Sequence, residues 1–339
     1  MLTKPTDLAD PEVGAALRTG WGFRAKSLKY LAVGGGSHHW LATDGCGEQR
    51  FLAVTDLPVF VRNQADTTDA LFARLRAALL TALALREQAG LEFVIAPIRR
   101  DDDEPMSRFS ERYSLTVYRY LRGTHAGEDG QYRQASDRRA VLDLLVRLHQ
   151  VRADEALADT FVLPHREKLQ RALDDSGRTW DGGPYAERAR QLLRTHAVDL
   201  EKLTAAYDVL AARLATRPER AVVTHGEPHA GNVMLTPDGP VLIDWDTVRL
   251  APPERDLWTL AEADESLLAR YCAATGRSLD QDALSFYRLW FDLAEIGEYL
   301  GLFHEAHEQS ADAAESWRNL HNHLRPAQRW PELVRRRAL

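Results

Sequence analysis

One short run of strand-forming sequence, residues 221–245, interrupts a second half of the chain that otherwise has the pattern of helices. It contains the apolar runs AVVT, VMLT and PVLIDW, and the Asp238-Gly239 pair before the last of them favours a tight β-hairpin. The first 120 residues show the opposite pattern, several strand-like runs around one long helix. Because strands and helices do not alternate along the chain, a doubly wound sheet is a poor fit and an α+β fold is expected.

The first 120 residues contain most of the predicted strands. Apolar residues at helical spacing predict one helix over residues 67–88. A glycine-rich turn, Gly34-Gly35-Gly36-Ser37, separates the first two strands, and no helix follows it. This order argues against a dinucleotide-binding fingerprint, and no GxxxxGK[ST] motif is present either. Strands are predicted at residues 27–33, 38–43, 50–55, 91–98 and 114–121.

Length, charge and cysteine content narrow the class of protein. The 339 residues exceed what one hydrophobic core usually supports, so two lobes are expected, residues 1–120 and 121–339. A formal net charge of −7 argues against a nucleic-acid partner. Cys46 and Cys272 lack the spacing of a disulfide framework or a zinc site. Without an apolar signal core or a run near the ~20 residues of a membrane span, we expect a cytoplasmic monomer or homodimer with no membrane contact.

The chemistry of the chain is concentrated in the run THGEPHAGN, residues 224–232, and in the following VLIDWD. A strand delivers a tight polar loop, and the hairpin returns a second carboxylate beside it. This order can bring Glu227, Asn232 and Asp244 together around one reacting centre. Phosphoryl transfer requires such a set, with a carboxylate for the acceptor alcohol and oxygen ligands that hold Mg²⁺ against the phosphates.

At these residues the sequence resembles the aminoglycoside phosphotransferase family, which shares its fold with the protein kinases. The runs THGEPHAGNVM and IDWDTVRLAPPERDLW are most similar to the spectinomycin phosphotransferase branch. The resemblance implies a two-lobe protein-kinase-like fold. A small β-rich nucleotide-binding lobe over residues 1–120 would precede a larger, mainly helical catalytic and substrate-binding lobe over residues 121–339, with the catalytic hairpin embedded in it. It also implies ATP or GTP as the donor, with Mg²⁺.

The resemblance assigns roles to single residues of the hairpin segment. Glu227 takes the place of the catalytic base, and Asn232 and Asp244 take the places of the two magnesium ligands. His225 would pack and form hydrogen bonds under the loop. Asp256 would brace the loop backbone from the start of the next helix.

The nucleotide-binding residues are expected in two places of the first lobe. Backbone N–H groups of the turn Gly34, Gly35, Gly36 and Ser37 can cradle phosphates, although a plain flexible hairpin has the same sequence. Val117 and Tyr120 lie where the kinase hinge would present backbone groups to the base. The alternative for this segment is an ordinary buried strand.

Two positions depart from the family pattern. Glu227 replaces the usual aspartate, and its extra methylene moves the carboxylate by up to about 1.5 Å. Ala53 stands near the place of a strand-borne lysine that holds the nucleotide phosphates. Lys29, Arg62 or the glycine-rich turn could substitute for it. No helix glutamate that would pair with such a lysine is identifiable, since Glu87 lies near the helix end.

The substrate is expected to bind to the helical lobe. Acidic side chains outnumber basic ones over residues 254–315, and a long amphipathic helix is predicted over residues 283–307. Such a run is often a solvated face, and an anionic wall for a cationic substrate is the functional alternative. The residues assigned to this substrate site are Asp292, Glu295, Tyr299, Trp245 and Asp246.

The sequence therefore predicts a magnesium-dependent small-molecule phosphotransferase. It would move the γ-phosphoryl group of ATP or GTP to a hydroxyl of an aminocyclitol or aminoglycoside antibiotic, and so confer resistance. A kinase of another small metabolite or of a nucleoside antibiotic is one alternative. A pseudokinase that binds a nucleotide without transfer is the other, suggested by Ala53 and Glu227.

Overall fold

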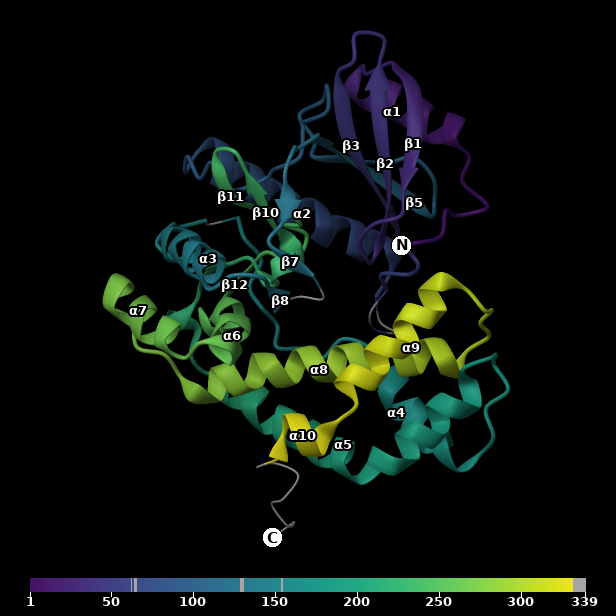
Figure 1. The fold of residues 1–339 in the computed structure, drawn as a ribbon, viewed down its shortest axis with the longest axis vertical. Helices are drawn as coiled ribbons and strands as arrows, with labels where there is room; N and C mark the ends of the chain where they lie inside the picture. The colour runs from purple at the N-terminus through teal and green to yellow at the C-terminus, as the bar shows by residue number, and fades with distance from the viewer. Residues whose placement is uncertain (62, 64–65, 129–130, 154, 332–339) are drawn as a thin grey trace. The chain divides into compact units, whose positions relative to one another are not determined.

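The computed structural model describes residues 1–61, 63, 66–128, 131–153 and 155–331 (Figure 1). The chain forms two compact units, and the first combines residues 1–61, 66–159 and 219–280. The second is built mainly from residues 160–218 and from residue 281 onward. The segment with the predicted chemistry thus shares a compact unit with the β-rich N-terminal residues. The division into lobes 1–120 and 121–339 stays a prediction.

A five-stranded antiparallel sheet forms the N-terminal part of the first unit, in the order β1-β2-β3-β5-β4. Four predicted strands are confirmed to within a few residues. The prediction over residues 91–98 is wrong, because this segment is a turn and an extended connection with one isolated bridge. The strands are β1 Ala25–Leu31, β2 Ser37–Asp44, β3 Gln49–Asp56, β4 Met106–Arg108 and β5 Tyr113–Arg119.

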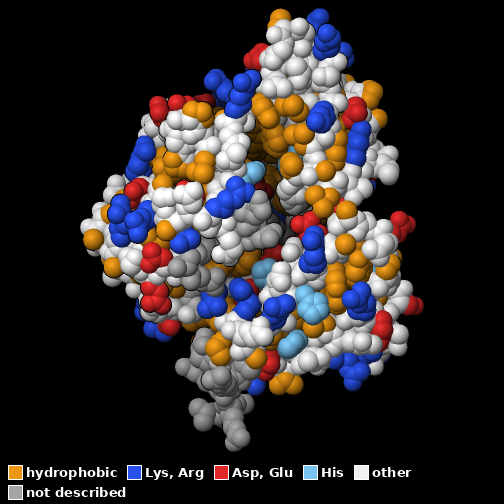
Figure 2. All heavy atoms as spheres, viewed as in Figure 1, with side chains coloured by type: hydrophobic (Ala, Val, Ile, Leu, Met, Phe, Trp, Pro, Cys, Tyr) orange, Lys and Arg blue, Asp and Glu red, His pale blue; other side chains and the backbone are white. Residues whose placement is uncertain are grey.

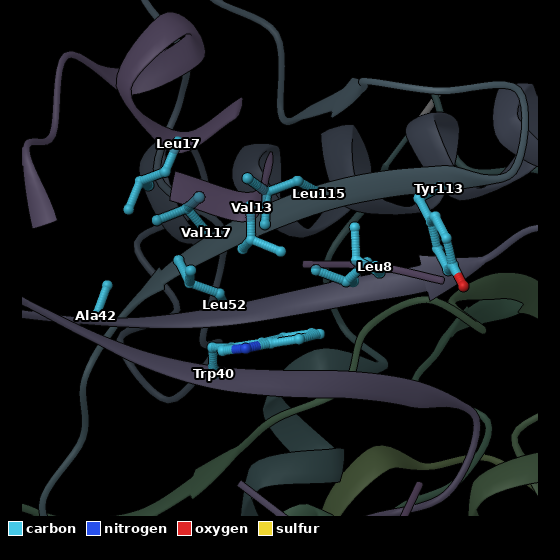
Figure 3. Packing of buried hydrophobic residues seen from close by; sticks show 10 residues of the cluster. Leu8, Val13, Leu17, Trp40, Ala42, Leu52, Tyr113, Leu115 and Val117 are labelled. Atoms are coloured by element: carbon cyan, nitrogen blue, oxygen red, sulfur yellow. The ribbon is translucent and has the colours of Figure 1, made fainter. Parts of the chain in front are cut away.

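The two faces of this sheet carry different helices. Helix α1, Asp10–Trp21, packs Val13 and Leu17 on the face that holds Leu52 and Val117 (Figure 3). Helix α2, Thr68–Glu87, forms a second apolar cluster with Met106 of β4. Because Met106 pairs with Thr116, which pairs with Ala53, α2 covers the edge of the face that carries Ala53.

The rest of the first unit holds the predicted catalytic segment on small sheets and short helices. The Asp238-Gly239 hairpin is confirmed, and it joins β10 to β11, with β6 on the other side of β10. The elements are β6 Thr124–His125, β7 Gly127–Glu128, β8 Gln131–Tyr132, β9 Val222–Thr224, β10 Val233–Thr236, β11 Gly239–Leu242, β12 Arg249–Ala251, α3 Ala135–Leu148, α6 Glu254–Ala263 and α7 Ser266–Thr275, with 3-10 turns Pro218–Arg220 and Ala230–Asn232.

The connection over residues 93–98 links the five-stranded sheet to the hairpin. Leu242 donates its N–H to the carbonyl of Phe93 at 2.8 Å, and Ile98 donates to the carbonyl of Val117 at 2.7 Å. Figure 2 shows a hollow with hydrophobic side chains along its wall between this sheet and the β10–β11 hairpin. The segment predicted as a strand therefore holds two sheets in place instead of extending one.

The second unit is helical in the part that the structure describes. The predicted apolar stripe of α8 is confirmed, since Leu289, Leu293, Ile296 and Leu300 are all buried. None of the described helices combines the length and the hydropathy that a membrane crossing requires. The helices are α4 Arg166–Asp174, α5 Ala186–Leu214, α8 Gln281–His304, α9 Ala311–His323 and α10 Pro326–Arg329, with a 3-10 turn Asp175–Gly177.

Candidate active site

The loop after β9 makes a tight turn at Gly226. Its φ is +103°, and a Cβ at this position would lie 2.5 Å from the guanidinium of Arg255. That guanidinium is itself held in place, since it donates to the Thr224 hydroxyl and to the Thr247 carbonyl, both at 2.9 Å. Only glycine fits this combination of backbone conformation and close approach.

Asp256, at the start of α6, lies directly behind the loop. Its carboxylate is fully buried and accepts the N–H groups of His225 at 2.8 Å and Gly226 at 2.6 Å. Burial by itself would raise the pKa of the Asp256 carboxyl, but the hydrogen bond from His149 and the positive charge of Arg255 lower it overall. An ionised Asp256 thus holds two consecutive loop amides.

His225 lies under the loop, with no exposed surface. Its Nδ1 accepts the Glu227 N–H at 3.3 Å, so the proton is on Nε2, which donates to the Ile243 carbonyl at 2.9 Å. Burial lowers the pKa of His225 and keeps the ring neutral. Its edge contacts Trp245, whose centroid lies 4.6 Å away. His225 thereby connects the loop of Glu227 to the chain just before Asp244.

Asn232 and Glu227 meet at the far end of the loop. The Asn232 side-chain amide donates to the Glu227 carbonyl at 3.1 Å, which leaves its Oδ1 as an acceptor for a ligand. Ile243 donates its N–H to the Asn232 carbonyl at 3.0 Å, so the residues on either side of the hairpin are adjacent. The Glu227 side chain is partly exposed.

Asp244 follows β11 with a φ of +67°, a left-handed conformation that is uncommon for a residue other than glycine. It is exposed, and Asp246 is partly exposed. Trp245 between them is buried and donates its indole N–H to the Leu242 carbonyl at 2.9 Å. Trp245, predicted to contact substrate, is therefore a packing residue, since its polar atom already has a partner and its ring is covered.

The donor set suits a magnesium ion that is also held by phosphate oxygens. The described residues contain no group of three or more His, Cys, Asp or Glu side chains that could hold a metal by themselves. One carboxylate, Asp244, and one amide oxygen, Asn232, are the kind of partial oxygen shell that Mg²⁺ completes with phosphates and water. The residues present thus fit this ion.

Two glycines of the glycine-rich turn adopt a left-handed backbone conformation. Gly34 and Gly36 have φ values of +68° and +81°, and a Cβ at Gly36 would lie 2.8 Å from the Phe60 ring. The Ser37 hydroxyl is 3.3 Å from the Thr55 hydroxyl of β3. Both glycines are therefore required for the shape of the turn.

The two residues predicted at the hinge lie in different surroundings. Val117 is fully buried on the face covered by α1, and its carbonyl accepts the Ile98 N–H. Tyr120 follows the end of β5 and is 40% exposed. Tyr118 between them, which sequence reasoning missed, lies on the opposite face with Phe51. Burial raises the pKa of Tyr118, and the nearby negative charges of Asp244 and Asp246 raise it further.

The lysine and its helix partner are both missing in the described part of the chain. Ala53 pairs with His39 on one side and with Thr116 on the other. The acidic residues of α2 are Asp69 and Glu87, which lie in its first and last turns and bind Arg108 and Arg99. The middle of α2 therefore offers no carboxylate to a lysine at position 53.

Of the two side chains proposed as substitutes for this lysine, only Lys29 can be placed. Lys29 pairs with Leu41, whose other neighbour is Phe51, so Lys29 lies two strands away from β3. Arg62 lies outside the described residues. His39, which sequence reasoning did not assign to the nucleotide, is the direct neighbour of Ala53 and stacks on Phe51. Only the strand register brings it there, and the sequence carries no signal of that register.

His39 is a neutral group in this position. Burial lowers its pKa to about 4. Its Nδ1 lies 2.9 Å from the Val33 carbonyl and therefore carries the proton. The ring thus tethers the glycine-rich turn and supplies no positive charge for phosphates.

The predicted substrate residues of α8 lie in the second unit. Asp292 is buried and accepts hydrogen bonds from His323 at 3.0 Å, Arg329 at 2.7 Å and Trp330 at 2.8 Å. It anchors the C-terminal segment and is not available to a substrate. Glu295 is 25% exposed and accepts the Tyr299 hydroxyl, one turn along the helix.

Comparisons with known proteins agree with this geometry. A sequence profile of the phosphotransferase enzyme family matches residues 43–299. Protein StrN of Streptomyces griseus is 31% identical over 255 residues, which cover 71% of this chain and 74% of StrN. A solved spectinomycin phosphotransferase in complex with ADP and spectinomycin is similar with a TM-score of 0.72 at 14% identity, covering 94% of this chain and 95% of its own.

A second solved structure, an amicoumacin kinase in complex with AMP-PNP and Ca²⁺, has a TM-score of 0.58 at 14% identity, over 94% of this chain and 93% of its own. The predicted resemblance and the predicted protein-kinase-like α+β fold are confirmed by these findings. At this level of identity the solved structures speak for the fold alone.

Proposed function

Because the chain belongs to the phosphotransferase enzyme family, we propose that it moves the γ-phosphoryl group of ATP or GTP to a hydroxyl of a small cationic molecule. The observation that carries the proposal is the loop and hairpin that hold Glu227, Asn232 and Asp244 on adjacent backbone. Asn232 approaches Glu227 through its side chain, and the residue before Asp244 is bound to Asn232. Phosphoryl transfer depends on positioning and charge stabilisation, which such a rigid loop supplies.

Each residue of the site has one task in this proposal. Asn232 and Asp244 would hold Mg²⁺, which supplies positive charge against the phosphates when bound. Glu227 would orient the acceptor hydroxyl and accept its proton. The acceptor oxygen forms the new bond to the γ-phosphorus as the bond from that phosphorus to the bridging oxygen of the diphosphate breaks. Asp256 and His225 hold the loop backbone meanwhile.

An aminocyclitol or aminoglycoside antibiotic is the acceptor class that we propose, with resistance as the outcome. The formal net charge of −7 suits a cationic acceptor, and Glu295 and Tyr299 of α8 stay predictions for the substrate site. Asp246 stays a candidate because it is partly exposed beside Asp244. Asp292 and Trp245 are left out, since both are buried and hydrogen-bonded within the protein.

A pseudokinase is the second candidate, and one observation favours it. Ala53 carries no positive charge for nucleotide phosphates, and the middle of α2 offers no carboxylate that would pair with a lysine there. Such a protein would bind a nucleotide without transferring its phosphoryl group.

Product formation separates these candidates. The purified protein is incubated with Mg·ATP or Mg·GTP and a panel of aminocyclitols, aminoglycosides, nucleoside antibiotics and amino alcohols, and phosphorylated products are measured by mass spectrometry. We expect one antibiotic of the first two groups to be phosphorylated, and Glu227→Gln to lower kcat by about 10²-fold or more. Nucleotide binding without product from any acceptor supports the pseudokinase, and product only from an amino alcohol supports a metabolite kinase.

A further inference from the structure

Two buried residues outside every predicted motif, His149 and Tyr271, lie in line behind Asp256. His149 follows the end of α3 with 1% exposure, and Tyr271 lies in α7 with none. Nε2 of His149 is 3.1 Å from Oδ2 of Asp256, and its Nδ1 is 2.8 Å from the Tyr271 hydroxyl. One polar side chain each from α6, from α7 and from the residue that follows α3 thus form a continuous series of hydrogen bonds.

The donor and the acceptor in each of these two hydrogen bonds follow from Asp256 at one end and Tyr271 at the other. Asp256 is held in the ionised form and can only accept, so Nε2 of His149 carries the proton. In a neutral imidazole Nδ1 is then the acceptor, and the Tyr271 O–H fills it. Burial raises the pKa of the Tyr271 hydroxyl, so it remains a donor. Each neighbour of His149 therefore selects the same tautomer.

This series of hydrogen bonds continues from Asp256 to the backbone of the catalytic loop. Oδ1 of Asp256 accepts the Gly226 N–H and Oδ2 accepts the His225 N–H, so a rotation of this carboxylate would displace both amides next to Glu227. The donor on His149 approaches Oδ2 from α3 and opposes such a rotation. An apolar side chain at position 149 would leave a buried carboxylate oxygen and a buried hydroxyl without this partner.

We propose that His149 and Tyr271 are positioning residues, which fix the orientation of Asp256 and through it the backbone that carries Glu227. This inference rests on the proposed phosphotransfer at Glu227. It assigns no contact with substrate to either residue, and it predicts an effect on kcat without an equal effect on nucleotide binding.

Four variants test this proposal. His149→Leu removes both hydrogen bonds, His149→Gln keeps an amide donor toward Asp256, and Tyr271→Phe removes the distal donor alone. Tyr113→Phe is the matched control, because Tyr113 is 3% exposed and donates to the Asp7 carboxylate at 2.8 Å, away from the loop. We measure kcat, the KM for nucleotide, the melting temperature and the hydrogen exchange of peptides that cover residues 222–232.

We expect His149→Leu to lower kcat by about 10- to 100-fold, with the KM for nucleotide within about threefold of wild type. Exchange over residues 222–232 should rise more than elsewhere in the first unit. His149→Gln should keep most of the wild-type kcat. The kcat of Tyr271→Phe should lie between those of wild type and His149→Leu, and the kcat and loop exchange of Tyr113→Phe should equal those of wild type.

Two outcomes would overturn the proposal. One is wild-type kcat and loop exchange in Tyr271→Phe and in His149→Leu. The other is a His149→Gln variant as impaired as His149→Leu, with exchange raised evenly through the unit, which indicates packing alone. If His149→Leu fails to fold, the comparison of His149→Gln with Tyr271→Phe decides. Loop exchange is read without turnover, so a wild type inactive on every acceptor refutes the proposed function and leaves this test standing.

Discussion

Single residues with a left-handed backbone shape the catalytic loop. Gly226 has a φ of +103° and Asp244 a φ of +67°. For a residue with a side chain this region carries a strain of about 1–3 kcal/mol, which persists where the surroundings enforce it. At Asp244 the surroundings are the bond from Ile243 to Asn232 and the buried ring of Trp245. The protein thus accepts local strain at a residue assigned to the metal.

An alanine at position 226 would suffer both backbone strain and a steric clash with Arg255, and a comparison with Gly239 separates these two effects. We expect Gly226→Ala to lower kcat by about 10²-fold, because the Arg255 guanidinium at 2.5 Å would displace the loop. Gly239→Ala is the control, since its φ is +116° and nothing lies within 4 Å of the added Cβ. It should lower the free energy of unfolding by about 1–3 kcal/mol and leave kcat unchanged. Steady-state kinetics and urea unfolding check both, and equal kcat in the two variants would contradict this account.

At the scale of elements, β3 and α2 both lack a member of the lysine–carboxylate pair that the family resemblance implies. Ala53 carries no charge, and the acidic residues of α2 lie only in its first and last turns. A lone loss on either element would leave a buried charge without a partner, which is strongly unfavourable. The neutral ring of His39 beside Ala53 is consistent with a site that has no fixed cation on this strand.

This pair of elements leads to a prediction about metal dependence. With no strand lysine, Mg²⁺ carries more of the charge compensation, so removal of Mg²⁺ should weaken ATP binding by about 10²-fold or more. The ratio of the Kd for ATP without Mg²⁺ to the Kd with Mg²⁺ measures this dependence. Ala53→Lys should lower that ratio by about threefold or more, because it adds a cation, whereas Ala53→Met, of similar length and uncharged, should leave it unchanged. Calorimetric titration of ATP with and without Mg²⁺ gives the ratio. The same ratio in both variants would mean that position 53 does not approach the phosphates.

At the scale of the whole molecule, each of the two compact units contains a buried carboxylate that accepts several hydrogen bonds from other segments. In the first, a buried carboxylate, Asp256, orders a loop that carries chemistry. In the second, a buried carboxylate of the same type, Asp292, joins α8 to the C-terminal segment through His323, Arg329 and Trp330. A buried carboxylate thus orders the loop that we propose for catalysis in one unit and anchors the C-terminal segment in the other.

The second unit can therefore be destabilised through Asp292. We expect Asp292→Ala to lower the free energy of unfolding by about 3 kcal/mol, because it leaves the charge of Arg329 without its buried partner. Asp282→Ala is the matched control on the same helix, since its pair with Arg213 is largely at the surface and should contribute less than about 1 kcal/mol. Urea unfolding of the two variants gives the difference. Equal losses would show that the anchor adds no more than a surface pair.

The sequence predicted helices and strands well where apolar residues followed a single repeat, either every second residue or every three to four residues. The strands around Trp40, Leu52 and Leu115 alternate apolar residues, and α8 repeats them at helical spacing, so both were found from the sequence. Helix α1 was missed because Pro11, Gly14 and Gly20 weaken its helical pattern. The segment over residues 91–98 has the composition of a strand, but its apolar residues pack between two sheets without forming a ladder in either.

The sequence by itself determined that Glu227, Asn232 and Asp244 lie on one loop and hairpin, because their spacing is a local property, and the chemistry assigned to them stays a prediction. The sequence also determined the order of β-rich and helical parts. Only the tertiary structure decided which distant residues support Asp256, whose contact with the loop the sequence predicts: His149 reaches it from the end of α3, with Tyr271 of α7 behind His149. His39 reaches Ala53 only through strand register. The tertiary structure also showed that Asp292 and Trp245 are buried in the protein. Burial and partners depend on packing between segments far apart in the chain, and no local spacing encodes them.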